Sequence, residues 1–146
     1  MPYIVQSDLT PLIPEDWVGQ ALDDNDDGGE DAGLFTSIRE AAEEAVNDVL
    51  SATYTVPIAS PENYPTIKRA TRYEAARICY ERRGFKDEKF PHFKTWKMIW
   101  DKLEKIGAGD LPLGPGSGSN DQLAKPRGTV ITAPSKTYST SGGAAA

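Results

Sequence analysis

The sequence predicts an all-α protein, a small antiparallel helical bundle with an extended C-terminal arm. Between Gly33 and Tyr54, apolar residues recur at i, i+3, i+4 and i+7 for four turns, opposite an acidic face. Two further helical stretches follow, so we expect this helix to be the spine of the bundle. From residue 111 the composition shifts to Gly, Ser, Pro and Thr, which separates a helical domain (1–110) from a tail (111–146).

The composition limits the class of protein. The chain has 146 residues, 38% of them apolar, which is enough for one domain of ordinary size. It holds no run of about eighteen apolar residues, and its start lacks the basic and apolar regions of a signal peptide. The single cysteine, Cys79, excludes an internal disulfide and fits a reducing compartment. We therefore expect synthesis in the cytoplasm.

Local signals place two short helices before the spine helix. Ser7 or Asp8 is expected to cap a brief helix that starts at Leu9. A second helix begins at Pro14, where the first turn tolerates a proline, and ends at Asp23. The spine helix must stop before Pro57, because a proline pushes the preceding residue into an extended conformation.

Two more helices follow the spine helix. The third starts at Pro65 or Thr66, runs to about Arg83 and is closed by Gly84. The fourth covers about His92 to Ile106, opened by Pro91 and ended by the glycines around Ala108. It carries Phe93, Trp96 and Trp100 on one stripe, which predicts a place in the core or in a subunit interface.

An acidic stretch, DDNDDGGED, joins the second helix to the spine helix at residues 23–31. Asp23, Asn25 and Asp27, followed by Gly28, match the opening of a calcium loop. The match fails at the twelfth position, where Leu34 replaces the bidentate glutamate. We therefore predict an acidic turn that caps the spine helix and no metal site, with these three residues as weak loop-only candidates for a cation.

Charge is divided unevenly along the chain. Residues 1–62 carry a net charge of −13, residues 63–110 carry +5 and the tail carries +2, which gives −6 overall. An acidic half beside a basic half can pair within one fold or head-to-tail between copies, as in rings; both can also be plain solvated surfaces. We expect the basic third helix to pair with the acidic spine helix.

The sequence offers no catalytic constellation. His92 stands alone beside Pro91 and is expected at a helix cap or on the surface, and Cys79 is expected to be buried and inert. Phosphate-binding glycine motifs, nucleophile elbows and paired Cys and His ligands do not occur. We expect a protein that is not an enzyme, with no catalytic residue and no cofactor.

The order of these segments resembles a known family. The chain contains the segments TYTVP, at residues 53–57, and LEKIGAGDLPLG, at 103–114. It also contains the acidic turn with Asp27-Gly28 and a basic helix carrying Arg72 and Arg77. Over residues 3–114 this arrangement resembles the head–tail adaptor, or connector, proteins of tailed bacteriophages, in the Mu-like prophage branch.

The resemblance implies a structural role in the virion. Copies would form a dodecameric ring beneath the portal at the capsid vertex, extend the DNA channel and meet the next neck or tail protein. The tail would wedge against portal subunits, and residues 128–132 have the propensity to add a strand to a partner's sheet. The portal-binding candidates are Leu113, Leu123, Lys125, Arg127, Val130, Ile131, Lys136 and Tyr138.

An acidic surface would let the duplex slide, because it repels phosphate, whereas a basic lining would hold it. We therefore expect acidic residues to line the channel and the basic third helix to serve packing and subunit contacts. The lining candidates are Asp23, Asp26, Glu40, Glu43 and Glu44.

Three alternatives remain open. The chain could be a stand-alone helical binding module whose tail orders on a partner. It could be a calcium-responsive protein, which the missing glutamate disfavours. It could bind DNA through the third helix, which the net charge of −6 disfavours.

Overall fold

The computed structural model describes residues 2–113, and every regular element in that range is helical. The predicted all-α fold is therefore confirmed, while nearly all of the predicted tail lies outside the described residues. The elements are η1 (Gln6–Leu9), α1 (Glu15–Ala21), α2 (Leu34–Leu50), η2 (Pro61–Asn63), α3 (Pro65–Arg82), η3 (Asp87–Lys89) and α4 (Phe93–Gly107).

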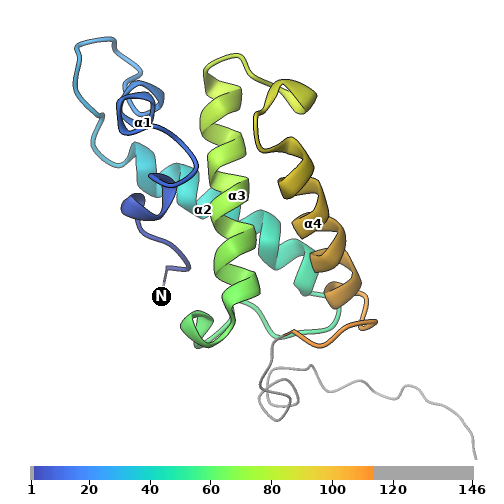
Figure 1. Cartoon of the computed structure of the whole chain (residues 1–146). Helices are drawn as coiled ribbons and strands as arrows, with labels where there is room; N and C mark the ends of the chain where they lie inside the picture. The colour runs from blue at the N-terminus through green and yellow to red at the C-terminus, as the bar shows by residue number, and fades with distance from the viewer. Residues whose placement is uncertain (1, 114–146) are drawn as a thin grey trace, which may run out of the picture.

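The centre of the bundle is α3 and not the expected spine helix, α2. Figure 1 shows α3 in front of α2, with α1 and the N-terminal segment on one side and α4 on the other. Helix α3 packs against all three of these helices, and α2 packs against α3 and α4. The expectation was wrong because a regular apolar stripe marks a helix covered along one side, and α3 is covered from several directions.

The buried side chains form two clusters at the two ends of α3. The first joins the N-terminal segment and α1 to the start of α2 and the end of α3: Ile4, Leu9, Ile13, Val18, Ala21, Leu22, Ile38, Ala42, Ala75, Ala76, Cys79, Tyr80 and Phe90. The second joins the end of α2 and the start of α3 to α4: Tyr3, Val46, Leu50, Tyr54, Ile58, Tyr64, Ile67, Ala70, Ile99, Leu103, Ile106 and Leu113. The buried stripe of α2 thus runs through both clusters.

The ends of α3 and α4 follow the local signals closely, whereas the two N-terminal helices differ from the prediction: α1 ends at Ala21, two residues before Asp23. Helix α3 starts at Pro65, and Gly84 follows its end with φ of 89°. The first short helix, however, ends at Leu9 instead of starting there, because the Asp8 carboxylate accepts a hydrogen bond from the Val5 N–H at 2.8 Å.

One glycine sets how closely α4 approaches α2. A Cβ at Gly107 would lie 2.1 Å from the Val49 carbonyl oxygen, far inside van der Waals contact. The Gly107 carbonyl also accepts a hydrogen bond from the Thr53 hydroxyl at 2.7 Å. The final turn of α4 therefore requires glycine at this position. Among residues 2–113, no helix has the length and apolar character needed to cross a membrane.

Candidate functional site

Arginine and aromatic side chains alternate over one surface of α3 and α4. Arg69, Tyr73 and Arg77 follow at four-residue spacing on α3, and Arg69 lies 5.9 Å from the Tyr73 ring centre. Arg77 lies 5.3 Å from the ring centre of Trp96 on α4, and Trp96 stacks on Trp100 at 5.6 Å. All four of Tyr73, Arg77, Trp96 and Trp100 are half-buried, and Arg69 is exposed. We call these five side chains the arginine–aromatic face.

A buried carboxylate holds this face in place. Glu74 is only 4% exposed, and it accepts two hydrogen bonds from Arg77, at 3.0 and 2.6 Å, and one from the Trp96 indole N–H at 2.8 Å. This pairing raises the pKa of Arg77, so the guanidinium stays charged. Glu74 was not among the residues predicted from the sequence, although its three-residue spacing from Arg77 is a signal of pairing on one helix.

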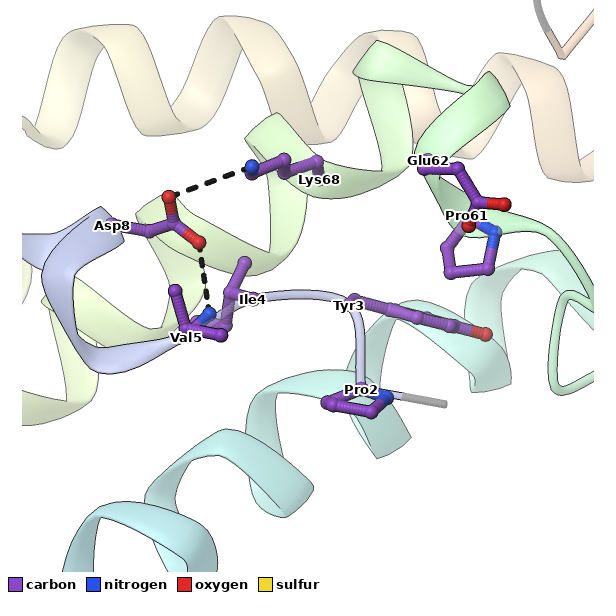
Figure 2. Close-up of a pocket in the computed structure, with 8 residues that line it drawn as sticks. All are labelled: Pro2, Tyr3, Ile4, Val5, Asp8, Pro61, Glu62 and Lys68. Atoms are coloured by element: carbon purple, nitrogen blue, oxygen red, sulfur yellow. Dashed lines mark hydrogen bonds and ion pairs between the residues drawn. The ribbon is translucent and has the colours of Figure 1, made fainter.

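The open pocket in Figure 2 lies between the N-terminal segment, η2 and α3 and has a volume of about 230 Å³. The Lys68 ammonium lies 3.5 Å from one oxygen of Asp8, whose other oxygen accepts the hydrogen bond from Val5. The two charges therefore offset each other, and the second oxygen of Asp8 is satisfied by the backbone. The arrangement is that of an ion pair that fastens the N-terminal segment to α3.

The acidic stretch forms a closed turn that satisfies its own backbone. Asp23 accepts hydrogen bonds from the N–H groups of Asp27 and Gly28, at 3.2 and 2.8 Å, and Asn25 also accepts from Asp27 at 3.0 Å. The predicted acidic turn is therefore confirmed. It does not cap α2 with a side chain, because the N-cap residue is Gly33.

The turn also brings together carboxylates that could hold a cation. One oxygen each of Asp23, Asp27 and Asp31 lies within 4.8 Å of the others. Asp31 was not among the sequence candidates, and it accepts a hydrogen bond from the Asp24 N–H at 2.7 Å. Oxygen ligands of this kind suit Ca²⁺, and exposed acidic turns also form without any ion.

The basic helix α3 pairs with acidic groups other than those of α2. Within the described chain its ion pairs to other elements reach Asp8, through Lys68, and Asp24, through Arg82. Arg82 also donates to the Ala21 carbonyl oxygen at 2.9 Å. The expected pairing of α3 with the acidic face of α2 is therefore wrong, because that face points away from α3, opposite its buried residues.

The channel-lining candidates fall into two groups. Glu40 and Glu44 are exposed on α2, and Asp26 is exposed in the turn with φ of 59°. Glu43 instead accepts a hydrogen bond from the Tyr3 N–H at 2.6 Å, and Asp23 is held within the turn. Because those two carboxylates already stabilise the chain, they are less available to a ligand or to solvent.

The histidine and the cysteine both have structural surroundings. His92 is the N-cap residue of α4, one of its two expected places, although its side chain makes no cap hydrogen bond. Its Nε2 atom lies 2.7 Å from the Leu12 carbonyl oxygen, so this half-buried ring connects α4 to the N-terminal segment. Cys79 is 1% exposed, as predicted, and burial raises the pKa of its thiol to about 11. The thiol is therefore protonated near neutral pH and is a poor nucleophile.

One portal-binding candidate falls within the described residues. Leu113 is 1% exposed and packs in the second core cluster, so its side chain faces this chain's own interior. The other candidates lie outside the described residues: Leu123, Lys125, Arg127, Val130, Ile131, Lys136 and Tyr138.

These features define a small all-α bundle with three distinctive surfaces: an acidic turn, an acidic face of α2 and the arginine–aromatic face. The family model for bacteriophage Mu, Gp36 matches residues 3–132, so the chain belongs to the Mu Gp36 family. Membership makes it a Mu-like phage protein and indicates a structural or assembly role. The comparisons with curated proteins and with solved structures give no match. The matched region continues beyond the described bundle into the C-terminal tail.

Proposed function

We propose that the protein is a structural component of the phage neck, a ring that joins the portal to the tail and extends the DNA channel without catalysis or a cofactor. The observation that carries this proposal is the family match over residues 3–132. The fold supports it, because the bundle presents separate charged surfaces suited to several neighbours at once.

The exposed acidic face of α2 is the best candidate for the channel lining. Glu40, Glu44 and Asp48 are all exposed and recur every four residues, opposite the buried residues Ile38 and Val46. A lining of this kind repels the phosphates of DNA and lets the duplex pass. A ring with Arg72, Arg77, Arg82 and Arg83 at its lumen would contradict this assignment.

The test of the neck proposal is a phage in which the gene for this protein is deleted. We expect electron microscopy of the lysate to show heads and free tails that do not join, and a supplied copy of the gene to restore whole particles. Normal tailed particles from the deletion phage would overturn the proposal.

We also propose that the C-terminal tail binds the portal. The family match includes the predicted contacts from Leu123 to Ile131, which supports a role for this segment. Deletion of residues 115–146 leaves the buried Leu113 in the chain, so the truncated protein should stay helical by circular dichroism and lose portal binding in a pull-down. Portal binding that survives this deletion would contradict the proposal.

A further inference from the structure

The arginine–aromatic face has the composition of a protein-binding surface. Trp, Tyr and Arg dominate the energetic centres of interfaces, where they sit in well-packed, desolvated positions. Here the two Trp rings are stacked on each other and Glu74 fixes Arg77, so little side-chain freedom remains to be lost on binding. At one end of the face, Arg69 is exposed and has no carboxylate within ion-pair distance among residues 2–113.

A surface of opposite charge lies elsewhere on the molecule. Between Glu15 and Asp31 the chain has eight acidic residues and no basic residue. Residues of α1 and the turn line an open recess of about 450 Å³, and Glu15, Asp16 and Asp26 are among them. These three side chains make no hydrogen bond or ion pair within the described chain. We call the recess and its carboxylates the acidic edge.

The acidic edge and the arginine–aromatic face lie on different sides of the bundle. In Figure 1, α1 and the turn lie on one side of α3, and α4 lies on the other. Arg82, which holds the turn through Asp24, comes five residues after Arg77 and is therefore about 140° further around α3. The two surfaces of one copy therefore cannot bind each other. In a dimer with two-fold symmetry they also cannot both face the partner, because they point in different directions.

We propose that the arginine–aromatic face of one copy binds the acidic edge of the next copy, with Arg69 directed to the recess that Glu15 and Asp16 line. The contact is head-to-tail, so repeating it closes a ring when the rotation from one copy to the next is a whole fraction of a full turn. This inference rests on the proposed ring. It gives Asp26 to the subunit contact and leaves Glu40 and Glu44 for the channel lining.

The test uses the full chain and two charge reversals, Arg69→Glu on the face and Glu15→Lys with Asp16→Lys on the edge. Mass photometry should show assembly of the wild type and about tenfold or greater weakening in either variant alone, because close charge pairs across interfaces contribute strongly. An equimolar mixture of the two variants should associate again, because one intact edge then meets one intact face. Lys102→Glu is the matched control, since Lys102 is exposed on another side of α4 and should not matter.

The outcomes separate this inference from the ring proposal. If both reversals assemble as well as the wild type, the copies meet through other faces and the inference is overturned, while the ring stands. If the wild-type chain is monomeric at every concentration, the inference is overturned, and portal binding then decides the neck proposal separately. Circular dichroism of each variant must show wild-type helix content for the comparison to count.

Discussion

Helices α2 and α3 are nearly equal in length, but α2 is buried along one side and α3 is buried on several sides. Helix α2 buries one stripe, Ile38, Ala42, Val46 and Leu50, and leaves its other side to acidic residues. Helix α3 buries Ile67, Ala70, Thr71, Glu74, Ala75, Ala76, Cys79 and Tyr80, which point in several directions. A clear amphipathic pattern therefore marks a helix at the side of a bundle, whereas a helix at the centre loses that pattern.

The side chains of α3 suit its central place. Alanines at 70, 75 and 76 allow close approach of neighbouring elements, and the buried Glu74 is fully paired. Several basic side chains of α3 reach outward: Lys68 to Asp8, Arg82 to Asp24, and Arg69 and Arg77 over aromatic rings. A helix rich in charge can therefore be the core of a small bundle.

The largest expected effect comes from the buried carboxylate of α3. Glu74→Ala leaves the Arg77 guanidinium and the Trp96 N–H without their acceptor, and should lower the free energy of unfolding by about 3 kcal/mol. Glu44→Ala, on the exposed side of α2, should change it by less than about 0.5 kcal/mol. Urea unfolding of both variants measures the difference, and equal effects would show that α3 is not the more constrained helix.

Two alanines give the next comparison. Ala75 on α3 is fully buried, so Ala75→Leu should destabilise the fold by about 2 kcal/mol through overpacking. Ala41 on α2 is exposed, and Ala41→Leu should stay within about 0.5 kcal/mol of the wild type. Thermal unfolding of the pair decides this, and a neutral Ala75→Leu would mean that the space around α3 is less filled than the structure shows.

The smallest expected effect is a loss of stability in alkali caused by Cys79. Its thiol pKa rises from 9.0 to about 11 on folding, so the folded state holds the proton more tightly than the unfolded state. The contribution is complete below about pH 9 and falls by about 1 kcal/mol by pH 10, because the unfolded thiol ionises first. Burial also raises the pKa of Tyr3, Tyr54 and Tyr80, so the whole protein should weaken in the same direction.

The measurement is urea unfolding of the wild type and of Cys79→Ala near pH 8 and near pH 10. The variant is expected to be less stable at both values because it leaves a small cavity, but to lose about 1 kcal/mol less between them. An identical pH dependence in the two proteins would remove Cys79 from this explanation.

Local sequence signals were enough to predict the helical class and most helix ends. Pro65 and Gly84 bound α3, and Gly107 to Gly109 end α4, because prolines and glycines act on the backbone within one turn. The sequence also predicted the burial of Cys79 and the acidic turn, in which the Asp23, Asn25 and Asp31 side chains accept hydrogen bonds from backbone N–H groups at most seven positions away. The family resemblance likewise rested on short sequence segments. The match to the Mu Gp36 family confirms that the protein is Mu-like.

In contrast, contacts between distant parts of the chain set which helix lies at the centre and where the polar groups find partners. The Trp96 N–H reaches Glu74 across 22 residues, His92 reaches Leu12 across 80, and Arg82 reaches Ala21 across 61. Such contacts depend on how the helices are placed in space, and helical periodicity describes only neighbours along one helix. Apolar spacing therefore showed that each helix has a side to bury, while packing chose the partner that covers it.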